Sequence, residues 1–347
     1  MAAPRFNPRC SVKDTVKERV LTMNTAEKNI INLIADIGGT NIRLAQADEQ
    51  SESKYTNIET YQCAKFDSLA DVISIYIKNK QLKSATINAC LAIACPVDDD
   101  IISMTNLPWQ FSQKTLIKTL GLNNLTMIND YTAIAMAIPL LNDDQKVKIG
   151  GGETVADKPI AVCGPGTGLG VANLVPVNGQ WHCFSGEGGH TDFAAVDELD
   201  IQILQFLRNI KQRVSYEQLL SGYGLEQIYQ ALSAIHQHDT KLLNAKDIST
   251  NALDGSCPTC AQALAQFCKI LGSFAGNLAL TMNSQGGVYI AGGIVPRFVE
   301  YFKNSGFRAR FETKGRLSHI TVQTPTYVIT EQQPGLLGAA AFLFQQQ

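Results

Sequence analysis

The chain has 347 residues, of which 45% are hydrophobic and 17% are charged, and its formal net charge is -2. This length accommodates two ordinary domains around sizeable cores, and the composition is that of a soluble globular protein. The near-neutral charge gives no electrostatic case for binding nucleic acid or an anionic membrane surface. No uninterrupted apolar run approaches the roughly 20 residues that span a bilayer. We therefore expect a cytoplasmic protein with no nucleic-acid partner and no membrane partner.

The nine cysteines are an odd number, and most of them lie within apolar segments. Thiols in such positions behave as small buried hydrophobic side chains, which fits a reducing compartment. Cys257 and Cys260 form a single C-x-x-C pair. A structural zinc site needs a second pair of ligands, and His236 and His238 are candidates only by proximity in the sequence. The pair is therefore weak evidence for zinc and for redox chemistry.

Residues 1–29 differ from the rest of the chain, because they are basic and show little apolar periodicity before Ile30. They lack the apolar core of a secretory signal, and the acidic Asp14 and Glu18 count against a targeting peptide. We expect an N-terminal extension that is disordered or loosely docked. Met23 lies just before the first predicted strand and is an alternative start of the protein.

The fold is predicted to begin with a β-hairpin. An apolar strand over 30–37 ends at a Gly-Gly turn, and a second strand follows over 40–47. A Walker A loop is excluded, because its G-x-x-x-x-G-K-[ST] sequence and the helix directly after it are missing. In the turn segment 36–40, Asp36 is able to hold a hydrated Mg²⁺ while the turn amides face phosphate oxygens.

A buried strand over 125–128 ends on two polar residues, Asn129 and Asp130, and a helix pattern begins at once. Side chains at the carboxyl end of a parallel strand project into the crevice where open α/β sheets bind ligands. Asp130 is well placed there to act as a general base. The alternative is that Asp130 only caps the helix, which aspartate does readily. Before this strand we expect helices over 68–78 and 113–120 and a strand over 86–94.

The polar, glycine-rich span 142–159 is predicted to be a linker and a domain boundary. After it the opening pattern returns, with a strand over 160–163, a glycine-rich turn over 164–170 and a strand over 171–177. A second set of turn amides would close on the same phosphates from the opposite side. Two such hairpins flanking Asp130 are stronger evidence than either hairpin alone.

The loop 185–192 has three glycines around Glu187 and His190. Glycines let the backbone approach a ligand closely, while carboxylate and imidazole groups suit vicinal hydroxyls. The alternative is a glycine-rich surface turn. Glu217 is predicted to open a helix that continues into Leu219 and Leu220, where an acidic residue also favours the helix by itself.

The C-terminal third begins with a long apolar helix over 261–282, in which Gly272 and Gly276 permit close packing. A strand over 288–291 runs into Gly292 and Gly293 at the start of a helix, an arrangement that suits the phosphate or ribose of a nucleotide. A strand over 326–330 and a helix of small residues over 335–344 complete the chain. The repeated hairpin-then-helix layout predicts two α/β halves with a cleft between them.

Together these segments resemble the bacterial-type glucokinases of the hexokinase, Hsp70 and actin superfamily. Residues 36–43 are similar to the family's first phosphate motif, 164–170 to the second, and 291–297 to the adenosine motif. The sugar-binding segments of the family are similar to 104–106, 128–130, 186–190 and 221–222, together with Glu217. The likeness covers about residue 30 to the C-terminus, in order and without a large gap.

The resemblance implies a fold of two actin-like, ribonuclease H-like α/β domains separated by a deep cleft. The small domain would comprise 30–140 plus 331–347, and the large domain 141–330. It implies an ATP-dependent glucokinase that forms glucose 6-phosphate and ADP with Mg²⁺, and a homodimer.

The resemblance also implies the site residues. Asp130 would accept the proton of the sugar 6-hydroxyl, and Asp36 would orient Mg²⁺ through water. The other sugar-binding residues would be Asn106, Asn129, Glu187, His190 and Glu217. The nucleotide would contact Asp36, Gly38, Gly39, Thr40, Gly166, Thr167, Gly168, Gly292 and Gly293.

Two features bear on alternatives. The chain lacks the Cys-rich zinc motif of the ROK-type sugar kinases, which favours the zinc-free branch and leaves His190 free for sugar. The same fold also supports kinases for another hexose or amino sugar, or for acetate or glycerol. A sugar-responsive regulator on this fold would carry an N-terminal helix-turn-helix, for which residues 1–30 are too short and too aperiodic.

Overall fold

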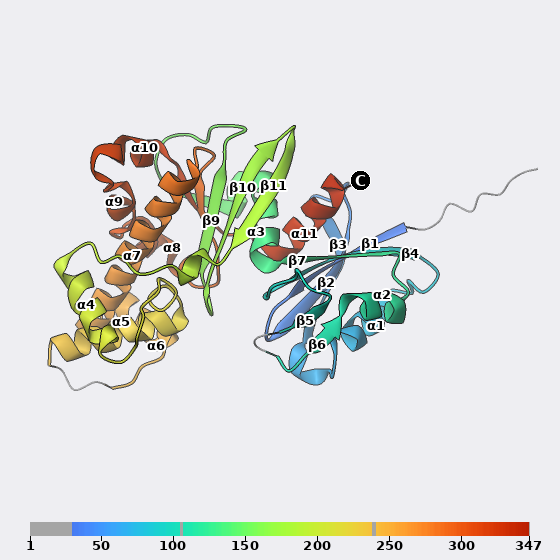
Figure 1. Cartoon of the computed structure of the whole chain (residues 1–347), viewed down its shortest axis with the longest axis horizontal. Coiled ribbons are helices and arrows are strands. Elements are labelled where there is room, and N and C mark those ends of the chain that lie inside the picture. Colours follow the sequence, from blue (N-terminus) through green and yellow to red (C-terminus); the bar gives the residue numbers. More distant parts are fainter. Residues whose placement is uncertain (1–29, 105–106, 238–240, 347) are drawn as a thin grey trace, which may run out of the picture.

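The computed structural model describes residues 30–104, 107–237 and 241–346. These residues form a five-stranded sheet, a six-stranded sheet and a small two-stranded sheet. Figure 1 shows helices on the outer face of each large sheet, with α3 (Asp130–Ala137) and α11 (Pro334–Gln345) between the two sheets. The layer order is therefore helices, sheet, α3 with α11, sheet, helices.

The five-stranded sheet has the strand order β3-β2-β1-β4-β7. Its strands are β1 Ile30–Ile37, β2 Asn41–Ala47, β3 Tyr55–Gln62, β4 Thr86–Ile93 and β7 Asn124–Asn129. Because β1, β4 and β7 run parallel, Ile37, Ile93 and Asn129 lie side by side in register. The first hairpin turn and the Asn129–Asp130 pair therefore meet at one edge of this sheet.

Both faces of the five-stranded sheet are covered by helices. Leu33, Ala35 and Ile37 point to the outer core with α1 (Leu69–Asn79) and α2 (Gln113–Leu120), whereas Ile34 points to the inner core with α3 and α11. Strands buried on both faces read as continuous apolar runs, which explains why β1 and β4 were predictable. The two-stranded sheet consists of β5 Ile101–Ser103 and β6 Gln110–Ser112.

The six-stranded sheet has the order β11-β10-β9-β12-β13-β8. Its strands are β8 Lys146–Gly150, β9 Ile160–Pro165, β10 Leu169–Val177, β11 Gln180–Gly186, β12 Val288–Ile290 and β13 Thr326–Ile329. The prediction of a linker over 142–159 is wrong in its middle, since β8 lies there and pairs with β13. Edge strands such as β8 are short and partly solvated, so β8 carries too little apolar signal to be recognised.

The outer face of the six-stranded sheet is covered by helices grouped around α7. They are α4 Glu198–Arg208, α5 Gly222–Ile235, α6 Ala245–Leu253, α7 Pro258–Met282, α8 Val299–Lys303, α9 Phe307–Glu312 and α10 Ser318–Gln323. Short 3₁₀ turns occur at Cys63–Lys65, Ile138–Leu140, Asp143–Gln145, Gly188–His190, Val295–Phe298 and Gly315–Leu317.

Helix α7 is long and apolar enough, by length and composition alone, to cross a membrane. However, 72% of its most apolar window is buried inside the fold, where it forms the centre of the larger core. The predicted close packing along this helix is confirmed. A Cβ atom at Gly272 would stand 2.2 Å from the carbonyl oxygen of Phe307, and one at Gly276 would stand 2.6 Å from that of Phe311. The backbone of α9 therefore rests directly on α7.

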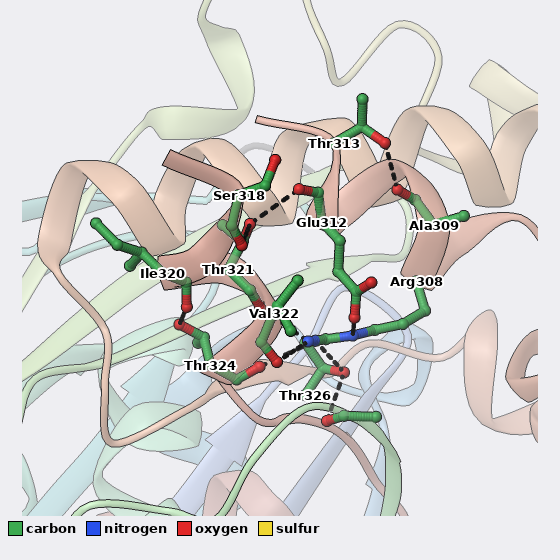
Figure 2. Close-up of polar contacts among 11 residues, drawn as sticks. Arg308, Ala309, Glu312, Thr313, Ser318, Ile320, Thr321, Val322, Thr324 and Thr326 are labelled. Carbon is green, nitrogen blue, oxygen red and sulfur yellow. Dashed lines mark hydrogen bonds and ion pairs between the residues drawn. The ribbon is translucent and has the colours of Figure 1, made fainter. Parts of the chain in front are cut away.

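A single arginine fixes α9 against α10 and β13 (Figure 2). Arg308 donates from Nε to Glu312, and its Nη2 donates to the carbonyl oxygens of Thr321 and Val322 at the end of α10. Its Nη1 donates to the carbonyl oxygen of Thr324 at 2.9 Å. Carbonyl groups at a helix C-terminus lack intrahelical partners, and a guanidinium group satisfies several of them at once.

Candidate active site

Asp36, the first hairpin turn and Asp130 lie at the sheet edge where β1, β4 and β7 end. The first hairpin turn, 38–40, follows β1, and Asp36 precedes it. Asp130 follows β7 and is the first residue of α3. Burial raises the pKa of Asp130, and the electrostatic interaction with the Asp36 carboxylate adds to the rise. The prediction that Asp130 stands at the end of a buried parallel strand is confirmed.

Asn129, rather than Asp130, is the N-cap of α3. Its side-chain oxygen accepts the N–H of Tyr131 at 2.9 Å, and its backbone is extended. The Asp130 carboxylate accepts the same N–H at 3.0 Å from the first helical position. An amide side chain at the N-cap already satisfies a free helix N–H group, so capping alone does not account for the carboxylate at position 130.

Burial raises the pKa of Asp130 to about 6, and the negative charge of Asp36 adds to that shift. The hydrogen bond from the Tyr131 N–H opposes the shift, because it stabilises the carboxylate form. A carboxylate with a pKa near 6 is unprotonated at neutral pH and binds a proton more readily than an exposed one. These are the properties of a general base.

Asp36 is held between Arg43 of β2 and the start of α11. Arg43 Nη1 lies 3.1 Å from Asp36 Oδ2. Burial raises the pKa of Asp36, against the lowering effect of Arg43. A Cβ atom at Gly335 would stand 2.8 Å from the Asp36 Cγ, so this carboxylate requires a glycine in the first turn of α11. Gly335 belongs to the site, and the sequence analysis did not identify it.

The donor set around Asp36 fits a hydrated magnesium ion. Among the described residues, the side-chain hydrogen bond that Asp36 accepts comes from Arg43 and uses the Oδ2 atom of the carboxylate. Oxygen ligands, few protein contacts and retained water molecules are what Mg²⁺ prefers. Two carboxylates that repel each other at one sheet edge also favour a divalent cation there.

The second glycine turn, 166–168, joins β9 to β10, is closed by an internal hydrogen bond and is bonded to the start of α5. The N–H of Gly166 donates to the carbonyl oxygen of Gly168 at 2.8 Å, and the N–H of Gly222 donates to that of Gly166 at 2.9 Å. The repeated hairpin is confirmed, because β9 and β10 pair antiparallel just as β1 and β2 do.

Tyr131 connects the candidate base to this second hairpin. Its hydroxyl donates to the carbonyl oxygen of Gly164 at 2.7 Å. A Cβ atom at Gly170 would stand 1.8 Å from its ring, and one at Gly164 would stand 2.3 Å from its hydroxyl. Both glycines are therefore needed for the ring to lie against β9 and β10. The sequence analysis did not single out Tyr131.

The structure brings Glu187, His190 and Glu217 together. His190 Nε2 lies 3.5 Å from a Glu217 carboxylate oxygen, and His190 Nδ1 lies 3.8 Å from one of Glu187. The predicted helix start at Glu217 is wrong: α5 begins at Gly222 with Ser221 as its N-cap. The Ser221 hydroxyl accepts the N–H of Gly224 at 3.0 Å, which places the helix boundary after the Leu219–Leu220 pair.

Gly292 and Gly293 follow β12, as predicted, but a regular α-helix does not begin there. A 3₁₀ turn over Val295–Phe298 precedes the short helix α8. Gly292 has a φ of 81°, and a Cβ atom there would stand 2.4 Å from the carbonyl oxygen of Pro165. This glycine allows the β12 end to touch the second hairpin. Asn106 lies outside the described residues.

Comparisons with protein families, curated proteins and solved structures all point to the same family. A protein-family model described as Glucokinase matches residues 33–346. A glucokinase of Colwellia psychrerythraea (strain 34H / ATCC BAA-681) is 66% identical over 327 residues, covering 93% of this chain and 98% of that protein. The crystal structure of a glucokinase from an Antarctic psychrotroph has a TM-score of 0.83 at 38% identity, covering 90% of this chain and 98% of that chain.

A glucokinase from Balamuthia mandrillaris, solved in complex with glucose, has a TM-score of 0.74 at 22% identity. The match covers 94% of this chain and 96% of that chain. At that identity the likeness shows the fold alone. The predicted actin-like α/β fold is confirmed by these structures.

Proposed function

This chain belongs to the glucokinase family, and we propose that it transfers the γ-phosphoryl group of ATP to the 6-hydroxyl of D-glucose. The products are glucose 6-phosphate and ADP. The observation that carries the proposal is the position of Asp130. Its carboxylate stands at the carboxyl end of β7, and Tyr131 ties it to the second glycine hairpin.

The sugar is held by polar side chains around Asp130. Asn129 binds the hydroxyls next to the reacting one, while Glu187, His190 and Glu217 bind those toward C1 and C2. Asn106 completes the set. The pairing of two carboxylates with an imidazole favours a neutral polyol over a carboxylated substrate, because an acid would call for Arg or Lys at these positions.

The nucleotide lies between the two glycine turns. Gly39 and Thr40 donate to its phosphates from one side, and Thr167 and Gly168 donate from the other. Gly38 and Gly166 shape the two turns, because their N–H groups donate to the carbonyl oxygens of Asn41 and Gly168. Gly292 and Gly293 border the ribose and adenine. Asp36 would hold Mg²⁺ through water, and the ion would supply charge neutralisation at the phosphates.

The chain's own contribution to the reaction is positioning and proton transfer. The Asp130 carboxylate accepts the proton of the sugar 6-hydroxyl as the hydroxyl oxygen attacks the γ-phosphorus. The bond from that phosphorus to the bridging oxygen of ADP breaks as the new O–P bond forms. Turn amides aimed at the phosphates stabilise the charge of the transition state without reorganising.

A coupled ADP-release assay with Mg²⁺-ATP tests the proposal. The panel is glucose, mannose, fructose, galactose, N-acetylglucosamine and N-acetylmannosamine. Turnover confined largely to glucose supports the proposal, because each inverted or missing hydroxyl leaves a polar group of the sugar site unpaired. Turnover mainly with an N-acetyl sugar would keep a kinase but overturn the glucose assignment. No turnover with any sugar, from folded protein, would overturn the proposal.

We extend the proposal to a cytoplasmic homodimer with a small domain of 30–140 plus 331–347 and a large domain of 141–330. The family resemblance supports the dimer. The packing of α11 against β1 and β4 supports the placement of the C-terminal segment with the first sheet. Light scattering after size-exclusion chromatography gives the oligomeric state, and a monomer across micromolar concentrations would contradict it.

A further inference from the structure

Glu217 is hydrogen-bonded to the second glycine turn as well as facing His190. Its Oε2 accepts the backbone N–H of Leu169, the first residue of β10, at 2.9 Å. Its Oε1 lies 3.5 Å from His190 Nε2. Its own N–H donates to the carbonyl oxygen of Gly189 at 2.9 Å. One carboxylate therefore has one oxygen on the nucleotide side and the other on the sugar side.

The two loops that Glu217 joins are in close backbone contact. A Cβ atom at Gly189 would stand 2.1 Å from the carbonyl oxygen of Leu169. A Cβ atom at Gly168 would stand 2.6 Å from Glu217 Oε2, so the carboxylate occupies space that any other residue at 168 would need. The Glu217 carboxylate thus lies in direct contact with the end of the turn 166–168.

We propose that Glu217 couples occupation of the sugar subsite to nucleotide binding at the second glycine turn. This inference rests on the proposed function. A sugar hydroxyl that donates to Oε1 fixes the carboxylate plane and keeps Oε2 on the Leu169 N–H. The turn amides are then held in place for the phosphates before the nucleotide arrives. Coupling is reciprocal, so the nucleotide tightens sugar binding by the same factor.

The test is the ratio of AMPPNP dissociation constants without and with saturating glucose, measured by calorimetry in the presence of Mg²⁺. We expect a ratio of at least about 5 for the unmodified protein, within the usual range of coupling energies. In Glu217→Gln we expect a ratio within about twofold of 1. A carboxamide has the same size but carries its acceptor oxygen on one side only, so it does not present an acceptor both to the Leu169 N–H and to a sugar hydroxyl on the opposite side.

Glu187→Gln is the matched control. Glu187 lies 3.8 Å from His190 on the other side of the ring, and the hydrogen bonds found within the described chain do not link its side chain to the turn 166–168. This substitution removes the same charge from the same sugar subsite. It should weaken glucose binding, yet at saturating glucose the ratio should equal that of the unmodified protein.

A second pair of variants perturbs the contact from the turn itself. Gly168→Ala displaces the flexible end of Glu217, which a folded protein tolerates. Gly166→Ala introduces the same methyl group into the same turn, where the nearest atom is the carbonyl oxygen of Gly168 at 3.9 Å. Gly168→Ala should lower the coupling ratio, and Gly166→Ala should not.

The outcomes separate the inference from the function. Thermal unfolding first establishes that each variant is folded, and Gly168→Ala replaces Glu217→Gln as the decisive variant if the latter does not fold. The inference is overturned if the decisive variant keeps the coupling ratio of the unmodified protein. It is also overturned if Glu187→Gln and Gly166→Ala lose as much of that ratio as the decisive variant does. Glucose turnover with a ratio of 1 in the unmodified protein overturns the coupling alone, whereas absence of glucose turnover overturns the proposed function.

Discussion

The Tyr131 hydroxyl donates a hydrogen bond to the carbonyl oxygen of Gly164 at 2.7 Å, and this bond joins α3 to β9. Its partners belong to different sheets: α3 follows β7 of the first sheet, whereas β9 lies inside the second. The residue directly before Tyr131 is the proposed base. The position of the Asp130 carboxylate relative to the phosphate turn therefore depends on how this tyrosine packs.

Replacing Tyr131 with phenylalanine removes only that hydroxyl. We expect kcat to fall by up to about tenfold, since a typical hydrogen bond contributes about 0.5–1.5 kcal/mol. The KM for glucose should change little, because the sugar-binding side chains are untouched. Tyr327→Phe is the control, as it removes a hydroxyl that lies 3.0 Å from Thr154 Oγ1. Equal kcat losses in the two variants would show that the Gly164 bond has no special role.

The glycine under the Tyr131 ring should tolerate no side chain. In Gly170→Ala the new Cβ would stand 1.8 Å from a ring carbon, so the ring or strand β10 has to move. We expect a loss of unfolding free energy of about 1–3 kcal/mol, together with reduced kcat. Gly186→Ala is the matched control, because no atom lies within 4 Å of its added Cβ. Denaturant titration of both variants measures the difference, and similar midpoints would contradict the proposed packing.

Asp130→Asn tests the base directly. The amide keeps the size of the side chain and an acceptor for the Tyr131 N–H, but it does not accept the substrate proton. We expect kcat to fall by at least about 10²-fold, the lower range for a lost general base. Near-normal turnover in a folded variant would refute the assignment.

The same substitution should raise thermal stability at neutral pH, with a defined pH dependence. The folded-state pKa of Asp130 is raised from 3.8 to about 6, mainly by burial. Its favourable contribution is complete below pH 3.8 and is lost as the pH rises through about 6. Replacing it with a neutral amide should therefore increase the melting temperature more at pH 8 than at pH 5. An equal increase at both pH values would argue against a raised pKa.

The raised pKa also predicts the acid limb of the rate profile. Only the unprotonated carboxylate accepts a proton, so kcat/KM for glucose should decline below about pH 6, by tenfold per pH unit. The kcat/KM profile reports the free enzyme, to which the cited pKa belongs. Rates measured with saturating coupling enzymes from pH 4.5 to 8 give the limb. A profile that stays flat down to pH 4.5 would exclude Asp130 as the titrating base.

The sequence predicted what depends on local patterns and missed what depends on tertiary contacts. The end of β7 at Asn129 and Asp130 was predictable because an apolar strand stops there and a helix pattern starts. Tyr131 was not, because its role comes from Gly164 and Gly170, more than 30 residues away. The turn at Glu217 looked helical because Leu219 and Leu220 are apolar, but both are buried against the core in a hydrogen-bonded turn that precedes α5.

Arg308 illustrates the same limit away from the site. Nothing in its sequence neighbourhood indicates that one guanidinium group binds carbonyl groups in α10 and after it (Figure 2). The two α/β halves, by contrast, followed from two strand–turn–strand segments along the chain, and the family resemblance of the motifs implied the actin-like fold. Local chemistry repeated along the chain is visible in a sequence, whereas contacts between distant segments require the folded structure.

The last turn of α11 is tied to edge strand β11 through one side chain. Gln345 Oε1 accepts the N–H of Trp181 at 2.9 Å, and Gln345 Nε2 donates to the carbonyl oxygen of Trp181 at 2.8 Å. Because α11 also packs against β1 and β4, this amide links the C-terminal helix of the first sheet to the second sheet. Gln345→Ala leaves both Trp181 groups without these partners and should cost about 1–3 kcal/mol of unfolding free energy.

Gln345→Glu should be at least as damaging, because a carboxylate accepts from the Trp181 N–H but repels the Trp181 carbonyl oxygen. Gln346→Ala is the control, since Gln346 is exposed and next in the chain, and it should change stability by less than about 0.5 kcal/mol. Urea titration monitored by tryptophan fluorescence follows the local environment of Trp181 together with global unfolding. If Gln345→Ala and Gln346→Ala unfold at the same urea concentration, the amide does not hold the two sheets together.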